Sequence, residues 1–286
     1  MPRKLILITG ATSGIGRVAA ESLARQGAHV VLVGRSPAKT EAAVAEIRRA
    51  TGSPAVDYLL ADLSVQAEVR RLADEFRGRY PRLDVLVNNA GGIYRWRQLS
   101  ADGRELTFAL NHLSYFLLTN LLLDTLRASA PARIVNVASN AHKRVPGLNL
   151  ADLEGAQAYS GLGAYAASKL ANILFTYELA RRLTGTGVTA NALHPGLIRT
   201  GFGANNGRLW QLLYVFINAL GRTPAQGAET VIQLASSPEV AGVTGQYFHE
   251  RQARRSSPAS YDEATARRLW ALSAAMVGQP ELAEFL

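Results

Sequence analysis

The sequence LILITGATSGIG, residues 5–16, sets the expected fold. Residues 5–9 form a short apolar run, typical of a parallel strand buried on both faces, and residues 17–26 follow with helical spacing. Between them, Gly10, Gly14 and Gly16 let the backbone turn tightly and approach a pyrophosphate, whose charge the helix N-terminus favours. The spacing GxxxGxG differs from the common GxGxxG, and glycines in this place can also serve the turn alone.

Strands and helices alternate along the rest of the chain. Apolar runs predict further strands at residues 28–34, 56–60, 83–87, 133–138 and 188–193, and a weaker one at 246–248. Helical spacing predicts helices at residues 37–50, 65–77, 100–126 and 159–183. This alternation requires crossover connections and gives a parallel sheet covered on both faces. Because no linker or repeat interrupts the pattern, we expect one α/β domain over residues 1–286, with a doubly wound sheet of about seven strands.

Two segments near the C-terminus allow more than one role. Residues 200–222 are rich in apolar and aromatic side chains. This composition suits a lid over a lipophilic substrate, a helix packed in the core, or a face that rests on a membrane surface. Residues 260–277 predict an amphipathic helix that caps the domain or contacts a second subunit, so a homo-oligomer is left open.

The composition excludes several classes of function. The chain has no Cys, so disulfides, thiol catalysis and Cys-ligated metal are ruled out. Its five His show no metal-ligand spacing, and we expect no metal site. The net charge of +9 comes from basic residues dispersed along the chain, without a recognition motif, so nucleic-acid binding is not expected. This charge suits an anionic cofactor or surface.

No targeting segment is evident. The residues before the first strand are too few for a signal peptide, and no run approaches the ~20 apolar residues that span a bilayer. We therefore expect a cytoplasmic protein.

The region after the second strand indicates which dinucleotide binds. NAD-binding folds place an Asp or Glu about 20 residues after the glycines, but no acid lies between Glu21 and Glu41. Arg35 follows the strand, and Lys39 lies one turn further. A cation in this place suits a 2′-phosphate, so we predict NADP(H) rather than NAD(H); the alternative is a solvated surface charge.

Two further strand ends point to the same edge. Asp62, after the third strand, falls where an adenine ring is expected and could accept from its amino group. Residues 88–91, NNAG, follow the fourth strand at the edge where open α/β sheets bind ligands. The alternative for NNAG is a plain polar turn.

The helix GAYAASKLANILFT, residues 163–176, carries Tyr165 and Lys169 one turn apart on one face. A nearby ammonium lowers the pKa of a phenol, which makes the phenol a general acid/base. The alternative is that Tyr165 packs while Lys169 extends to solvent. Ser139 and residues 194–196 end two other strands at this edge, so all can converge on one pocket.

The set TGATSGIG, NNAG, Asn111, Ser139 and YAASK, in this order, resembles the short-chain dehydrogenase/reductase family over roughly residues 4–250. The resemblance implies a Rossmann-type fold in which Tyr165 is the catalytic acid/base and Lys169 holds the nicotinamide ribose and lowers the Tyr165 pKa. It implies that Ser139 hydrogen-bonds the substrate oxygen and that Asn111 holds a water in a proton relay to Lys169. The implied reaction is reversible hydride transfer between NADP(H) and a carbonyl or alcohol carbon.

The motifs and this resemblance together give a set of expected cofactor-binding residues. They are Gly10, Ser13, Gly14, Ile15, Gly16, Arg35, Lys39, Asp62, Leu63, Asn89, Ala90, Gly91, Tyr165, Lys169, Pro195, Gly196, Ile198 and Thr200.

Longer stretches, including RIVNVASNAH and SKLANILFTYELARRL, look like the retinol-dehydrogenase and WW-domain-oxidoreductase-like branch. The 26-residue gap between Ser139 and Tyr165 also suits this branch. We therefore expect an NADP(H)-dependent enzyme that acts on a small, lipophilic alcohol, aldehyde or ketone. The alternatives are a regulator that binds NADP(H) without turnover and a different enzyme class, such as a methyltransferase, on a similar fold.

Overall fold

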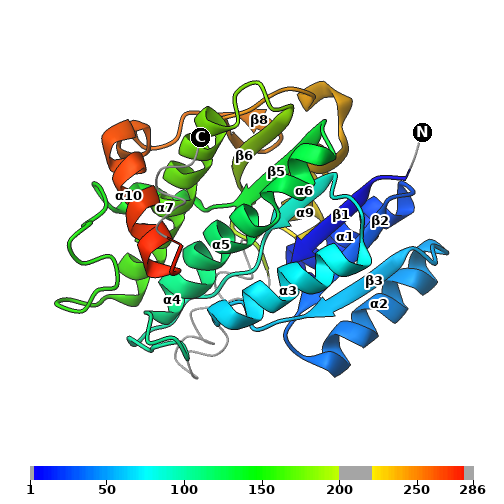
Figure 1. Ribbon diagram of the computed structural model, residues 1–286, viewed down its shortest axis with the longest axis horizontal. Coiled ribbons are helices and arrows are strands. Elements are labelled where there is room, and N and C mark those ends of the chain that lie inside the picture. The colour runs from blue at the N-terminus through cyan, green and yellow to red at the C-terminus, as the bar shows by residue number, and fades with distance from the viewer. Residues whose placement is uncertain (1–2, 200–220, 280–286) are drawn as a thin grey trace.

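The computed structural model describes residues 3–199 and 221–279. Its strands form one eight-stranded sheet. The strand order is β3-β2-β1-β4-β5-β6-β7-β8 (Figure 1). The strands are β1 (Leu5–Thr9), β2 (His29–Gly34), β3 (Val56–Leu60), β4 (Val85–Asn88), β5 (Ala132–Val137), β6 (Val188–His194), β7 (Tyr247–His249) and β8 (Gln252–Ala253). The pairs from β3 to β7 are parallel, so β8 is a short antiparallel addition to the seven strands predicted.

Helices cover both faces of the sheet. The longer ones are α1 (Gly14–Arg25), α2 (Pro37–Thr51), α3 (Gln66–Arg79), α5 (Ser114–Leu121), α6 (Leu123–Ala128), α7 (Gly161–Arg182), α9 (Pro224–Ser236) and α10 (Glu263–Met276). The short ones are α4 (Leu106–Phe108), η1 (Ala109–Leu113), η2 (Asn140–Arg144), η4 (Pro238–Val240) and η5 (Pro258–Tyr261). One apolar core lies under α1, α2 and α9, and the other under α3, α5 and α7, with α10 packed against α7 (Figure 1). The doubly wound α/β fold is confirmed.

The direction of winding reverses at β1. This strand pairs with β2 on one side and with β4 on the other. In open α/β sheets the ligand crevice lies at the carboxyl ends of the strands beside this reversal. The glycine-rich turn after β1 and the NNAG segment after β4 therefore lie side by side.

The helix predicted over residues 100–126 is interrupted, and the prediction of one continuous helix is wrong. Gly103 adopts φ +73, so the chain turns before the helix begins. Glu105 then caps the helix, because its carboxylate accepts from two backbone N–H groups of the first turn. The next residues form the π-helical segment η1, and a second break follows at Leu122, with φ −103 and ψ 5. Local capping here overrides a continuous apolar period.

Two helices begin later in the chain than the predicted starts at residues 159 and 260. Helix α7 begins at Gly161, after Ser160, whose hydroxyl accepts from Gly163 N. Helix α10 begins at Glu263, because Asp262 accepts from Thr265 N and ends the preceding 3₁₀ turn. Polar caps thus fix both helix starts.

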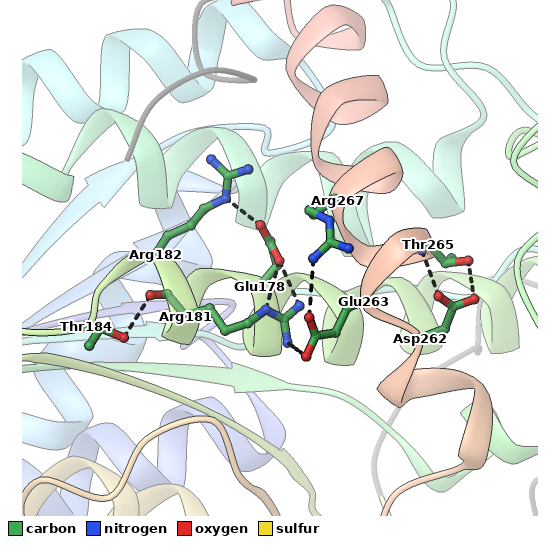
Figure 2. A network of polar contacts seen from close by, with 8 residues as sticks. All are labelled: Glu178, Arg181, Arg182, Thr184, Asp262, Glu263, Thr265 and Arg267. Carbon is green, nitrogen blue, oxygen red and sulfur yellow. Dashed lines mark hydrogen bonds and ion pairs between the residues drawn. The ribbon is translucent and has the colours of Figure 1, made fainter.

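Charged side chains join the C-terminal end of α7 to the start of α10 (Figure 2). Glu178 accepts from Arg181 at 2.7 Å and from Arg182 at 2.7 Å. Glu263 lies 3.8 Å from Arg181 and 3.3 Å from Arg267. Glu178 is buried and Glu263 is 56% exposed at its side chain, so the network reaches from the core to the solvent.

Three arginines cover the outer edge of β3. Arg48 Nε donates to the carbonyl of Val56 at 3.0 Å, and a guanidinium N–H of Arg71 donates to that of Leu60 at 2.5 Å. Between them, Arg79 donates to the carbonyl of Tyr58 at 3.3 Å. Alternate carbonyls of this edge strand are thus capped by side chains from α2 and α3.

Within the two described ranges, no helix combines the length and the apolar character needed to cross a bilayer.

Candidate active site

The glycine-rich turn is shaped by Asn89. Its Nδ2 donates to the carbonyls of Thr9 at 2.8 Å and Gly10 at 3.1 Å. Gly10 adopts φ +64, a conformation that favours glycine. A Cβ on Gly16 would lie 2.5 Å from Asn89 Nδ2 and 2.5 Å from Gly10 O, so a side chain there would force the two segments apart. The NNAG segment therefore holds the turn in shape.

The N-terminus of α1 is suited to an anion. Its N-cap residue, Ser13, is exposed and makes no side-chain capping bond, and the first turn holds no acidic residue. The first N–H groups of a helix lack intrahelical partners and carry a partial positive charge. Together with Gly14 and Ile15 at the surface of this turn, they form a cradle that fits a pyrophosphate.

Arg35 and Asp62 form a pair beside this turn. The Arg35 side chain is 74% exposed, and its guanidinium donates to Asp62 Oδ2 at 3.3 Å. The other oxygen of Asp62 accepts from the hydroxyl of Ser64 at 2.6 Å and from its N–H at 3.0 Å. Burial opposes ionisation of Asp62, but these hydrogen bonds prevail and lower its pKa, so the carboxyl is ionised at neutral pH. Lys39 is exposed on the first turn of α2, and Leu63 is buried next to Asp62.

Lys169 is enclosed in the middle of the site. Its side chain is buried, and Nζ donates to the carbonyl of Val137 at 2.9 Å, two residues before Ser139. Burial lowers the pKa of Lys169 to about 7. A Cβ on Gly91 would lie 3.6 Å from this Nζ. The ammonium thus reaches from α7 to the ends of β4 and β5.

Two phenol rings flank Lys169. Its Nζ lies 5.7 Å from the ring centroid of Tyr165 and 5.7 Å from that of Tyr115. Tyr115 is buried and donates to Ala90 O at 2.8 Å, and burial together with the charge of Tyr165 raises its pKa. Tyr165 is only half-buried, so it is the phenol that a ligand can reach.

Ser139 ends β5 and caps the short helix η2. Its Oγ accepts from Ala141 N at 3.2 Å, and its hydroxyl remains half-buried at the edge of the sheet. Its carbonyl accepts from His142 Nδ1 at 2.6 Å, and His142 Nε2 in turn accepts from Ser257 N at 3.0 Å. The backbone of Ser139 is therefore held between β5 and the chain that leads to α10.

Asn111 connects the loop after β4 to helix α7. Its side-chain amide accepts from Gly92 N at 2.8 Å and donates to Gly92 O at 2.9 Å. The same Nδ2 donates to Ser168 Oγ at 3.0 Å, and Ser168 donates to the carbonyl of Tyr165 at 2.7 Å. The backbone carbonyl of Asn111 accepts from Asn172 Nδ2 at 2.8 Å.

The segment after β6 approaches the glycine-rich turn from the other side. Pro195 is half-buried, and Gly196 has φ +97. A Cβ on Gly227 of α9 would meet Ile198 Cδ1 at 2.6 Å and Ile15 Cγ1 at 3.3 Å, so both isoleucine side chains pack close to this helical residue. Thr200 and most of the expected lid, residues 200–220, lie outside the described residues.

The structure thus gathers Ser139, Tyr165 and Lys169 at one edge, next to the NNAG segment. The sequence reasoning missed Tyr115, Ser168 and Asn172. Tyr115 lies four residues after Asn111. Ser168 lies inside the YxxxK motif, and Asn172 follows Ser168 at helical spacing, which was a usable signal. In the described part of the chain no cluster of three His, Asp or Glu could hold a metal ion.

Comparison with known proteins finds one family model and a group of similar enzymes. Residues 4–208 match the model of the short chain dehydrogenase family. Human retinol dehydrogenase 14 is 45% identical, with 97% of this chain and 87% of that protein covered. Mouse retinol dehydrogenase 12 is 40% identical with the same coverage.

Solved structures agree with this result. A crystal structure from Mycobacterium paratuberculosis is 34% identical, with a TM-score of 0.76 over 96% of this chain and 93% of that one. A Shigella flexneri short chain dehydrogenase complexed with NADP is 26% identical, with a TM-score of 0.68 over 87% of this chain and 97% of that one.

Proposed function

Because the chain belongs to the short-chain dehydrogenase family, we propose that it is an NADP(H)-dependent oxidoreductase acting on a carbonyl or alcohol carbon. The observation that carries the proposal is the placement of Lys169, which is buried with Nζ 5.7 Å from the ring centre of Tyr165. A buried lysine that is partly protonated near neutral pH, beside a half-buried phenol, suits acid/base chemistry at that pH.

The cofactor would be held along the carboxyl edge of β1, β2 and β4. The open N-terminus of α1 suits its pyrophosphate, and Arg35 with Lys39 suits a 2′-phosphate. Asp62 suits the adenine amino group, and the segment of Pro195 and Ile198 suits the nicotinamide. Bound there, NADP(H) supplies or accepts the hydride. The Shigella flexneri relative solved with NADP supports this choice of dinucleotide.

The chain's own residues would handle the proton. In reduction, Tyr165 Oη donates a proton to the substrate oxygen, and in oxidation it takes that proton back. The ammonium form of Lys169 favours the phenolate and lowers the pKa of Tyr165. The Ser139 hydroxyl donates to the substrate oxygen and stabilises the charge that develops there. Asn111 fixes the loop at Gly92 relative to α7, and the water relay implied by the family stays a prediction.

A lipophilic substrate is supported by two observations. Several similar proteins are named retinol dehydrogenases. In addition, Trp96, Leu162 and Leu197 are 67%, 50% and 54% exposed and lie on segments that follow β4, open α7 and follow β6. Apolar side chains at the carboxyl edge of the sheet suit an apolar substrate better than a sugar or a polar acid.

The substitution Tyr165→Phe tests the acid/base assignment. We expect kcat for the NADPH-dependent reduction of decanal to fall by about 10²-fold or more, because the proton donor is lost. The dissociation constant for NADPH, followed by cofactor fluorescence, should change little. Tyr58→Phe, at a half-buried tyrosine on β3, is the matched control. Undiminished turnover in Tyr165→Phe would overturn the assignment, and an enzyme that prefers butanal to decanal would contradict the lipophilic substrate.

The double substitution Arg35→Ala/Lys39→Ala tests the dinucleotide. We expect the ratio of kcat/KM for NADPH over NADH to fall by about 10-fold or more, because a charge-assisted contact is worth at least ~1.5 kcal/mol. Arg25→Ala, an exposed arginine at the other end of α1, should leave the ratio unchanged. An unchanged ratio in the double variant would refute the phosphate role.

A further inference from the structure

A chain of buried neutral side chains runs from α10 to the site. Ser273 Oγ lies 2.9 Å from His112 Nε2, and His112 Nδ1 lies 3.2 Å from Asn172 Oδ1. Asn172 Nδ2 then donates to the carbonyl of Asn111 at 2.8 Å. The four residues are each 0% exposed, so water does not compete for these hydrogen bonds.

The acceptors along this chain determine the position of each proton. The Asn111 carbonyl can only accept, so the amide nitrogen of Asn172 faces it and the amide oxygen faces His112. This oxygen also only accepts, so Nδ1 of His112 carries the ring proton. Burial lowers the pKa of His112 to about 4, so the ring is neutral at physiological pH. His112 Nε2 therefore accepts a hydrogen bond from the Ser273 hydroxyl.

From Asn111 the contacts continue to the reacting phenol. The Asn111 amide holds both the N–H and the carbonyl of Gly92, next to the NNAG segment. It also donates to Ser168, which donates to the carbonyl of Tyr165. Movement of Asn111 would therefore change the distance between the NNAG segment and the first turns of α7.

We infer that His112 and Ser273 are positioning residues, through which α10 fixes Asn111 and thereby the placement of Tyr165 relative to the cofactor edge. The inference rests on the proposed function, in which Tyr165 moves the proton. The Asn172 amide carries no titratable proton, so this chain holds geometry and does not conduct protons. A displacement of about 1 Å at a reacting group costs up to about 10²-fold in rate.

The substitution His112→Phe tests the positioning role. Phenylalanine fills the ring site but removes both hydrogen bonds, so we expect kcat with NADPH and decanal to fall by about 10-fold or more while the NADPH dissociation constant stays nearly constant. His112→Gln, whose amide N–H can donate to Asn172, should recover part of kcat. Arg267→Ala, an exposed site on α10, is the control and should keep full kcat. Unchanged kcat in folded His112→Phe, or equal losses in the Phe and Gln variants, would overturn the inference.

A second readout is independent of turnover. In ¹⁵N-histidine NMR spectra, the His112 ring should show the Nδ1–H tautomer, whereas histidine in water favours Nε2–H. Ser273→Ala should shift the Nε2 resonance and leave the Nδ1 proton in place. An Nε2–H tautomer in the wild-type protein would contradict the chain. If the Nδ1–H tautomer is found but Tyr165→Phe turns over normally, the proposed function fails and the positioning role fails with it, while the hydrogen-bond chain stands.

Discussion

Among the contacts that join helices α7 and α10, two polar links are of opposite kinds. Toward the candidate active site the link is neutral and buried, through Asn172, His112 and Ser273. At the C-terminal end of α7 the link is ionic and largely open to solvent, through Arg181 and Glu263 (Figure 2).

The two links differ in what each polar group can bind when its partner is removed. An exposed carboxylate loses little when its partner leaves, because water replaces the partner. A buried amide or imidazole has no such replacement, and its desolvation cost appears in full. The neutral link should therefore specify position, whereas the ionic link contributes mainly to solubility and surface charge.

The largest expected effect comes from acid. Unfolded His112 takes up a proton below pH 6.5, whereas the folded ring stays neutral until about pH 4. The unfolded state thus binds more protons in this range, so the free energy of unfolding decreases as the pH falls from 6.5 to 4, by about 3 kcal/mol for this residue. Urea unfolding of wild type and of His112→Phe across this range measures how much of the decrease comes from His112. Burial also lowers the pKa values of His142 and His194, but these residues are common to both proteins, so their contribution cancels. Parallel pH profiles for the two proteins would show that His112 contributes nothing.

The next effect comes from Thr176→Val, one turn after Asn172 of the buried link. The Thr176 hydroxyl accepts from Asn136 Nδ2 at 2.9 Å and donates to Asn172 O at 2.6 Å. Its loss leaves a buried amide donor unpaired, so we expect the free energy of unfolding to fall by about 1–3 kcal/mol. Thr184→Val, which removes an exposed hydroxyl at the ionic end, should cost less than about 0.5 kcal/mol. Equal losses in the two valine variants would erase the distinction between the two links.

The smallest effect is expected from Glu263→Gln. This carboxylate is 56% exposed and contacts Arg181 and Arg267, and exposed pairs contribute about 0.2–1 kcal/mol. We expect a change in the free energy of unfolding of no more than about 0.5 kcal/mol at low salt, which about 1 M NaCl should abolish. Glu178→Gln changes the buried end of the same network, so it should lower the free energy of unfolding by more, and this loss should depend less on salt. If Glu263→Gln lowered the free energy of unfolding equally at low and high salt, the Glu263 contacts would behave like buried contacts, contrary to this prediction.

The sequence supported much of the fold because its strongest signals are local. Apolar runs marked β1 and β2, and glycines marked the turn between β1 and α1. The interrupted helix after the NNAG segment was not recovered, because a side-chain cap at Glu105 and the backbone of Gly103 decide it against the apolar period.

The sequence motifs marked residues that the structure gathers at one edge of the sheet, but not the buried polar residues that hold them in place. A search for apolar periodicity assumes that inward positions are apolar, yet His112, Ser168 and Asn172 are buried and polar. Their partners come from segments far apart in the chain, as with the 161 residues that separate His112 from Ser273. Only the folded structure brings such partners together, so single-sequence reasoning lacks the information.

The arginines along β3 have a consequence for how this protein behaves at high concentration. An uncovered edge strand is a template on which a second polypeptide can add a strand, the first step toward fibrils. A second polypeptide that paired with this edge would have to displace the guanidinium groups that already donate hydrogen bonds to the carbonyls of Val56, Tyr58 and Leu60. Folded copies of the chain at high concentration are thereby kept from pairing edge to edge at β3.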